Sequence, residues 1–123
     1  MIYASDTDRD ACQKFERCIE NYHLTDAVKV CQIDFFDLNP RELTDRIGTI
    51  CINPPYGRRL GAKQDSERFF NAMGEKLRQA YKGWKLVLIA PHRKAITSLP
   101  FQKHSIPIWH GGLKLRLLIG KIQ

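Results

Sequence analysis

Apolar residues recur with two different periods along the chain, and these periods predict an ordered series of strands and helices. Short apolar runs predict four strands, at residues 2–4, 28–33, 49–52 and 84–90. Apolar positions at helical spacing predict two helices, one over 11–22 and one over 69–80, each packing one face onto a sheet. Because strands and helices follow one another in turn, the pattern predicts an α/β fold.

The hydrophobic pattern of the C-terminal part of the chain predicts one buried strand and one hairpin. The strand at 84–90 is almost continuously apolar, which is typical of a strand buried on both faces in a parallel sheet covered by helices. Residues 105–109 and 113–119, around the turn His110-Gly111-Gly112, predict an antiparallel β-hairpin. The expected sheet is therefore mostly parallel and ends in an antiparallel hairpin.

Polar residues between these elements predict how the helices begin. In Ser5-Asp6-Thr7-Asp8, an Asp side chain can cap the free backbone N–H groups at the start of the first helix. Asp65 or Ser66 is the expected cap of the second helix. The segment 36–43 predicts a loop with one helical turn.

Composition narrows the classes of protein. A length of 123 residues allows one domain at most, and a net charge of +7 favours a polyanionic partner such as nucleic acid. No apolar run approaches the roughly 18 residues of a membrane span, and the polar N-terminus does not resemble a signal peptide. The cysteines have no metal-ligand spacing, so we expect no metal site and reduced, buried thiols in a cytosolic protein: Cys12, Cys18, Cys31 and Cys51.

The segment Asn53-Pro54-Pro55-Tyr56 directly follows the apolar run at 49–52. The two prolines have fixed φ angles and no N–H group, so they end the strand and stiffen the turn after it. The Asn53 side-chain oxygen and nearby carbonyls can then form a fixed set of hydrogen-bond acceptors. Tyr56 adds a flat face on which a planar heterocycle can stack, with its exocyclic amino group directed at those acceptors.

This segment resembles the catalytic loop of S-adenosylmethionine-dependent methyltransferases that modify the exocyclic nitrogen of adenine, guanine or glutamine. The longer string from Asn53 to Leu60 is most similar to RNA guanine-N2 methyltransferases, which are usually joined to a THUMP domain. The resemblance implies a Rossmann-like fold and cytoplasmic methylation of a guanine in ribosomal RNA or tRNA. Two alternatives stay open: an adenine-N6 methyltransferase of DNA or RNA, and a non-catalytic, RNA-binding remnant.

Acidic residues at two strand ends are candidates for binding the cofactor. Nucleotide-binding α/β folds hold ribose hydroxyls at the carboxyl ends of their strands. The resemblance assigns the ribose to Asp6, or next to Asp8, and the adenine amino group to Asp34, with Phe35 against the ring. It places Asn53 in both the cofactor site and the catalytic site. The alternative is a purely structural role, in which Asp6 and Asp8 only cap the helix.

Cations on two loops are candidates for binding RNA. Arg58, Arg59 and Lys63 follow the Asn-Pro-Pro-Tyr segment, and cations beside a reaction site suit phosphate contacts. Arg93 and Lys94 follow the strand at 84–90, on the ligand-binding side of such sheets. The alternative is a solvated loop whose charges serve solubility.

One part of the resembling enzymes is not found in this sequence. Their first strand ends in a glycine-rich loop and lies between the strands that end here at Asp6 and Asn53, but the chain contains no G-x-G. Residues 1–123 are therefore expected to form a partial methyltransferase domain that lacks this strand and leaves two sheet edges unpaired. A truncated reading frame, a fragment, or completion by a missing N-terminal segment, a second copy or another protein would each explain it.

Overall fold

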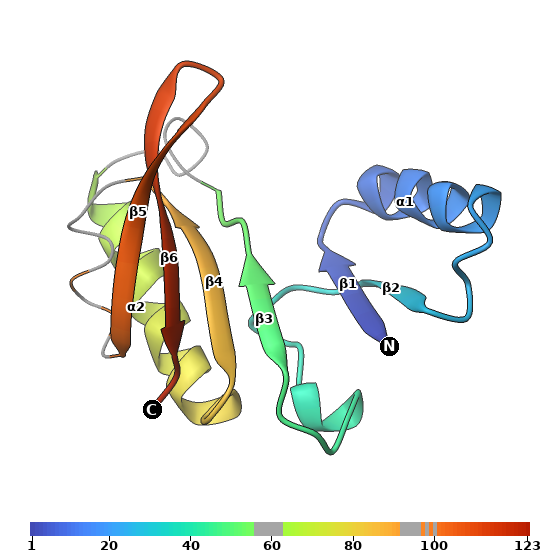
Figure 1. The fold of residues 1–123 in the computed structure, drawn as a ribbon, viewed down its shortest axis with the longest axis horizontal. Coiled ribbons are helices and arrows are strands. Elements are labelled where there is room, and N and C mark those ends of the chain that lie inside the picture. Colours follow the sequence, from blue (N-terminus) through green and yellow to red (C-terminus); the bar gives the residue numbers. More distant parts are fainter. Residues whose placement is uncertain (56–62, 92–96, 98, 100) are drawn as a thin grey trace. The chain divides into compact units, whose positions relative to one another are not determined.

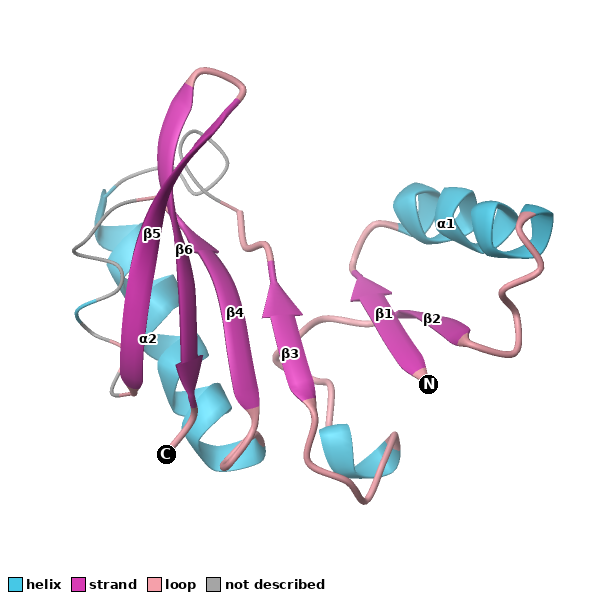
Figure 2. Ribbon diagram, in the orientation of Figure 1, coloured by secondary structure: helices cyan, strands magenta, loops and turns pink. Residues whose placement is uncertain are grey.

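A computed structural model describes residues 1–55, 63–91, 97, 99 and 101–123. The chain divides into two compact units, residues 1–44 and 45–123. Figures 1 and 2 show their elements, which are β1 (Ile2–Asp6), α1 (Arg9–Asn21), β2 (Val28–Gln32), the 3₁₀ helix η1 (Pro40–Glu42), β3 (Thr49–Ile52), α2 (Lys63–Ala80), β4 (Lys85–Ala90), β5 (Gln102–His110) and β6 (Leu113–Lys121).

The first unit is a β-α-β arrangement. Strands β1 and β2 pair in parallel, with Ile2 opposite Val28 and Asp6 opposite Gln32. Helix α1 joins them and buries Cys12 and Ile19 on its apolar face. The β-α pattern predicted from the apolar periodicity is therefore confirmed.

The second unit is a four-stranded sheet in the order β3-β4-β6-β5. Strands β3 and β4 pair in parallel, whereas β6 pairs antiparallel with both β4 and β5. Helix α2 lies along one face of this sheet (Figure 1). Large apolar side chains with almost no exposure form the core: Phe70, Met73, Leu77, Leu86, Leu88 and Leu118.

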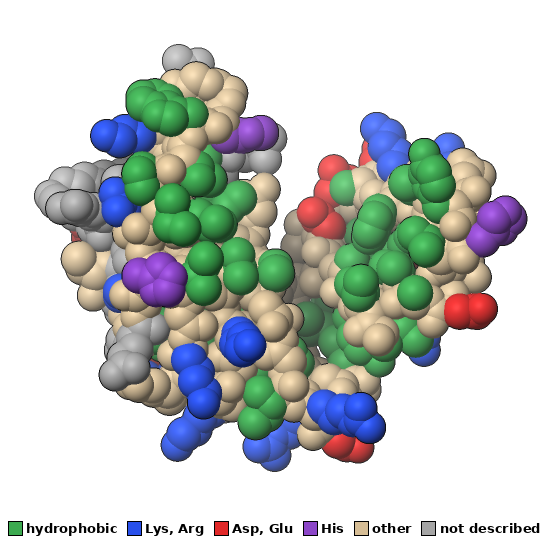
Figure 3. All heavy atoms as spheres, in the orientation of Figure 1, with side chains coloured by type: hydrophobic (Ala, Val, Ile, Leu, Met, Phe, Trp, Pro, Cys, Tyr) green, Lys and Arg blue, Asp and Glu red, His purple; other side chains and the backbone are tan. Residues whose placement is uncertain are grey.

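The other face of the four-stranded sheet is only half buried. On β4, Leu86, Leu88 and Ala90 are buried, but Val87 and Ile89 between them are not. Figure 3 shows hydrophobic side chains gathered over this face. The predicted burial of residues 84–90 on both faces is therefore wrong for the described residues, because α2 covers one face of the strand and no second helix of this unit covers the other.

The predicted C-terminal hairpin is confirmed. Gly111 and Gly112 have φ angles of 55° and 77°, and a two-residue hairpin turn of type I′ requires positive φ at both positions. The last residue of β4, Ala90, lies opposite Arg116, so β6 begins three residues beyond the end of β4. At 3.3 Å per residue, the hairpin extends about 10 Å past that end.

The structure corrects the start of one helix. Helix α2 begins at Lys63, so Asp65 and Ser66 lie in its first turn rather than at its cap. Propensity gives no boundary signal here, because polar residues precede the apolar face for a full turn. The single helical turn expected within 36–43 is present as η1.

All four cysteines are free thiols, as expected, but they are not all buried. Cys12 is buried, whereas Cys18 and Cys51 are exposed. Cys51 alternates with the half-buried Ile50 and Ile52 along β3, which turns its thiol to the uncovered side of the strand. No helix in the described residues is long and apolar enough to cross a membrane.

Substitutions on the two faces of β4 will differ in their effect on stability. Leu88→Ala removes a side chain with no exposed surface, so we expect a loss of about 2–5 kcal/mol in the free energy of unfolding. Ile89→Ala removes a similar volume from the half-buried face, and we expect less than half of that loss. Urea unfolding followed by circular dichroism measures both, and equal losses would contradict the assignment of the core to the α2 side.

Candidate active site

Two candidate cofactor residues lie at one edge of the first unit. Asp6 is the last residue of β1, and Asp34 follows the end of β2 by two residues. Because these strands are parallel, and Ile33 donates its N–H to the Asp6 carbonyl (3.1 Å), both carboxylates lie at the carboxyl ends of neighbouring strands. The side chains of Asp6 and Asp34 are exposed.

The loop between β1 and α1 is ordered by its own carboxylates. Asp6 Oδ1 accepts a hydrogen bond from the Asp8 N–H (2.8 Å), and Asp8 Oδ1 accepts one from the Asp10 N–H (2.9 Å). Asp8 is the N-cap of α1, so the expected capping by an Asp in this segment is confirmed. Gln32 Nε2 donates to the Thr7 carbonyl (3.2 Å), which ties the end of β2 to the same loop.

The loop after β2 is held in a similar way. Asp34 Oδ1 accepts a hydrogen bond from the Phe36 N–H (2.9 Å), closing an Asx turn. Phe35 is half-buried, and its ring meets that of Phe36 edge-on, with centroids 5.3 Å apart. Each turn uses one carboxylate oxygen, so Asp6 and Asp34 can each present the other oxygen to a ligand.

The candidate catalytic residues lie in the second unit. Asn53 follows β3 directly, at the carboxyl end of the parallel β3–β4 pair. Pro54 is buried, while Asn53 and Pro55 on either side of it are exposed. The buried proline anchors the turn, and the amide of Asn53 is left accessible at the edge of the sheet where α/β folds bind ligands.

Several predicted site residues fall outside the described residues. They are the stacking residue Tyr56 and the candidate RNA-binding residues Arg58, Arg59, Arg93 and Lys94. Lys63 is the first residue of α2. The acidic residues belong to the first unit and Asn53 to the second, so the structure brings Asp6 and Asp34 to one edge and presents Asn53 separately.

Two groups with a shifted pKa lie in the second unit, away from Asn53 along the chain. Burial raises the pKa of Tyr81, which packs edge-on against Trp84 in the core. Burial lowers the pKa of Lys103, whose ammonium group donates to the Leu99 carbonyl. Both shifts therefore have a structural cause in packing.

The exposed carboxylates where β1 and β2 end, and the exposed amide after β3, each lie at the carboxyl end of a parallel strand, where nucleotide-binding α/β folds hold their ligands. A family model for the RMKL-like methyltransferase domain matches residues 1–106. The chain belongs to this family. The resemblance carried by Asn53-Pro54-Pro55-Tyr56 is thereby confirmed for the methyltransferase domain.

Curated relatives of this family member are much longer proteins. Ribosomal RNA large subunit methyltransferase K/L of Ectopseudomonas mendocina (strain ymp) is 31% identical over 106 residues, covering 85% of this chain and 15% of that protein. The protein of the same name from Pseudomonas putida (strain W619) is also 31% identical over 106 residues, covering 85% and 14%. The chain thus spans 14–15% of the length of these relatives.

Solved structures confirm the predicted fold class. The crystal structure of SMU.472 complexed with SAH covers 99% of this chain and 32% of its own, with a TM-score of 0.82 at 23% identity. A possible methylase from Clostridium difficile 630 covers the same shares, with a TM-score of 0.81 at 22% identity. The chain therefore has a mixed α/β, methyltransferase-like fold.

The capping role of Asp8 can be separated from its negative charge. Asp8→Ala removes the acceptor for the Asp10 N–H, so we expect unfolding of the first unit to become easier by about 1 kcal/mol. Asp8→Asn keeps an acceptor and should lie within about 0.5 kcal/mol of wild type. Thermal unfolding, followed by the helical signal in circular dichroism, measures both variants. Glu16→Ala, which removes an exposed charge from the same helix, is the control, and an equal loss there would argue against capping.

Proposed function

We propose that this chain is part of an enzyme that transfers a methyl group from S-adenosylmethionine to an exocyclic amino group of a base in RNA. The substrate we favour is guanine N2 of ribosomal RNA or tRNA, modified in the cytoplasm. Support comes from family membership, from relatives that are named as ribosomal RNA large subunit methyltransferases, and from the Asn53-to-Leu60 string.

The observation that carries the proposal is the exposed Asn53 directly after β3, with Pro54 buried behind it. The Asn53 side-chain oxygen and the Pro54 carbonyl would accept hydrogen bonds from the amine of the target base. These bonds orient the nitrogen lone pair and stabilise the positive charge that develops on nitrogen during transfer. Tyr56 would hold the unstacked base, and no strong general base is needed.

The described residues fit the nucleoside half of the cofactor. Asp6 would accept hydrogen bonds from ribose hydroxyls and Asp34 from the adenine amino group, with Phe35 against the ring; both carboxylates are exposed and each keeps one oxygen outside its turn. Asp8 is occupied as the cap of α1 and becomes the second choice for the ribose. S-adenosylmethionine, when bound, would supply the electrophilic methyl group and leave as S-adenosylhomocysteine, and the methylated amine would lose one N–H proton to water.

The sequence contains no G-x-G, so it has no glycine-rich loop to bind the methionine half of the cofactor. In the described residues, β1 pairs only with β2 and β3 only with β4, so each keeps one edge free for another strand. We infer that a further strand with a glycine-rich loop completes the site. It would come from an N-terminal segment, a second copy or another protein.

The chain alone should therefore bind S-adenosylmethionine weakly. We expect no saturation below about 1 mM in isothermal titration of the 123-residue chain, because only half of the ligand finds partners. Photo-crosslinking of labelled cofactor should become efficient when a strand and glycine-rich loop are fused before Met1. Micromolar binding by the chain alone would contradict the missing-strand account, and no labelling of the fusion would favour a non-catalytic remnant.

Asn53→Ala should abolish methyl transfer in the completed protein. We expect at least a 100-fold loss of label transferred from the cofactor to unmodified large-subunit ribosomal RNA, since an acceptor for the developing charge is removed. Cofactor labelling should stay within about twofold of wild type, and Asn71→Ala, which changes an exposed Asn on α2, should have no effect.

Mass spectrometry of the digested RNA separates the candidate products. N2-methylguanosine supports the favoured substrate, whereas N6-methyladenosine assigns the enzyme to the adenine-directed alternative. Turnover by Asn53→Ala equal to that of the Asn71→Ala control would remove Asn53 from the mechanism.

A further inference from the structure

An exposed tryptophan stands at the tip of the β5–β6 hairpin. Trp109 has 71% of its surface exposed, and Leu113 across the turn has 51%. The indole presents a large, flat apolar face to water, and Trp109 is much more exposed than the half-buried Trp84. The sequence predicted the hairpin, but it did not predict that this ring would lie outside the core.

The neighbours of Trp109 on its face of the hairpin are cationic. Lys114 lies directly opposite Trp109, and Arg116 lies opposite Pro107, two residues along the same face. Lys114 is exposed. Arg116 donates through Nε to Ser105 Oγ (2.8 Å), so its guanidinium is fixed in place and adds positive charge to this face.

The surrounding sequence carries no compensating acid. Residues 76–123 contain ten Lys and Arg and no Asp or Glu, so the sheet that bears the hairpin belongs to a strongly positive segment. A protein partner for an apolar tip would not require this charge, whereas a phosphate backbone would. Proteins bind single-stranded nucleic acid through this combination of an exposed ring and cations at fixed spacing, since bases stack on the ring and phosphates pair with Lys.

The hairpin protrudes from the edge of the sheet that carries Asn53. Strands β3 and β4 run in parallel and end at this edge, with Ile52 opposite Leu88. The hairpin continues past Ala90, the last residue of β4, and its tip extends beyond this edge (Figure 1). RNA that delivers a base to Asn53 would therefore run close to Trp109 and Lys114.

We propose that the β5–β6 hairpin is an RNA-contact element, in which Trp109 stacks on an unpaired base and Lys114 binds an adjacent phosphate. The two glycines of the turn hold both strands in register, so the ring and the ammonium group are presented together. The choice of RNA rests on the proposed function. The contact itself depends only on the hairpin and needs neither the cofactor nor the missing strand.

The test measures binding of the 123-residue chain to a fluorescein-labelled, 20-nucleotide single-stranded RNA of mixed sequence by fluorescence anisotropy. Trp109→Ala should weaken binding about 5- to 100-fold, whereas Trp109→Phe, which keeps a ring, should stay within about 5-fold. Lys114→Ala should weaken binding severalfold and lower the slope of log affinity against log salt by about 1.

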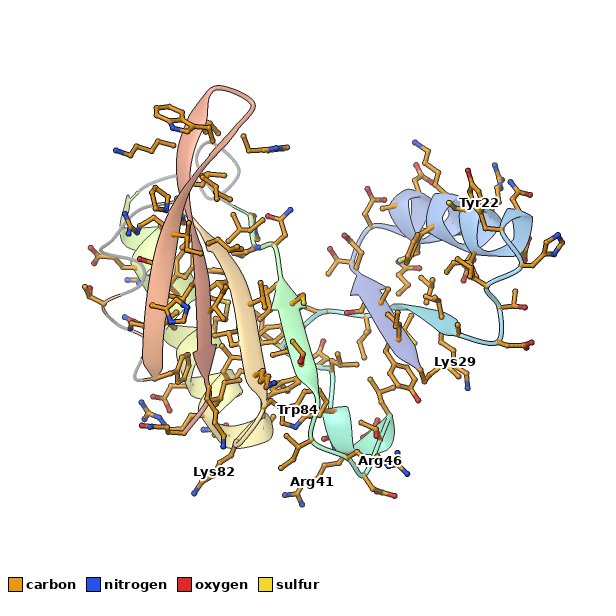
Figure 4. All side chains as sticks on the ribbon, viewed as in Figure 1. Tyr22, Lys29, Arg41, Arg46, Lys82 and Trp84 are labelled. Atoms are coloured by element: carbon orange, nitrogen blue, oxygen red, sulfur yellow. The ribbon has the colours of Figure 1, made fainter. Side chains whose placement is uncertain are left out.

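Matched controls come from the first unit. Tyr22 is as exposed as Trp109, at 72%, and Lys29 is an exposed strand lysine; both are labelled in Figure 4. Tyr22→Ala and Lys29→Ala should bind RNA within about twofold of wild type. RNA should also quench the tryptophan emission of the wild type, and Trp109→Phe should lose most of that quenching because only Trp84 remains.

Three results would overturn the proposal: no binding of this RNA by the wild type, equal affinity of Trp109→Ala and wild type, or equal losses in the Tyr22→Ala control. Unchanged RNA affinity together with loss of self-association in sedimentation would make the tip a contact between copies. Failure of the proposed function gives a different result. No base would be methylated, but RNA binding would still depend on Trp109.

Discussion

Parallel strand pairing is the constraint on which the rest of this structure depends. It aligns the carboxyl ends of β1 and β2 in the first unit, and those of β3 and β4 in the second. In the described residues, Asp6 and Asp34 close turns onto nearby N–H groups where β1 and β2 end, and Pro54 is buried next to Asn53 where β3 ends. The candidate site residues Asp6, Asp34 and Asn53 thus stand at the ends of paired strands. Residues held in place before binding lose little conformational entropy when a ligand binds.

Those local bonds also explain why a structural role and a binding role for the same carboxylates need not compete. An Asx turn or a cap engages one oxygen of the carboxylate and leaves the other. For Asp6 and Asp34 the turn fixes the direction of the other carboxylate oxygen, which suits the proposed contacts with the cofactor. Asp8 differs because its side-chain oxygen caps α1. This oxygen accepts a hydrogen bond from an N–H group that has no partner within the helix, so the stability of the helix depends on it.

Much of the fold could be predicted from the sequence, because the signals were local. The run 49–52 gave the exact bounds of β3, and Gly111-Gly112 gave the hairpin, since both depend on residues adjacent in the chain. Burial could not be predicted as well. Cys51 and Ile89 look like core residues in a hydrophobic pattern, but their exposure depends on which faces other elements cover, and that is a tertiary property.

The candidate site residues were recognised through motifs, and this explains why Trp109 was not among them. Asn53, Asp6 and Asp34 stand at fixed offsets from strand ends, where a motif can be recognised. Trp109 belongs to no motif, and only its exposure in the structure, beside Lys114, distinguishes it from a packed strand residue. A weaker signal was present in the sequence as the complete lack of acids after Glu75.

The two units differ in their charge. Residues 1–44 carry nine Asp and Glu against five Lys and Arg, whereas residues 45–123 carry four against fifteen. Under the proposed function, the positively charged sulfonium cofactor would meet the acidic unit, and the polyanionic RNA would meet the basic one. An even mixture of charges would repel each of these proposed ligands at part of its own site. The net charge of +7 conceals this division, which makes the position of the charges along the chain more informative than their sum.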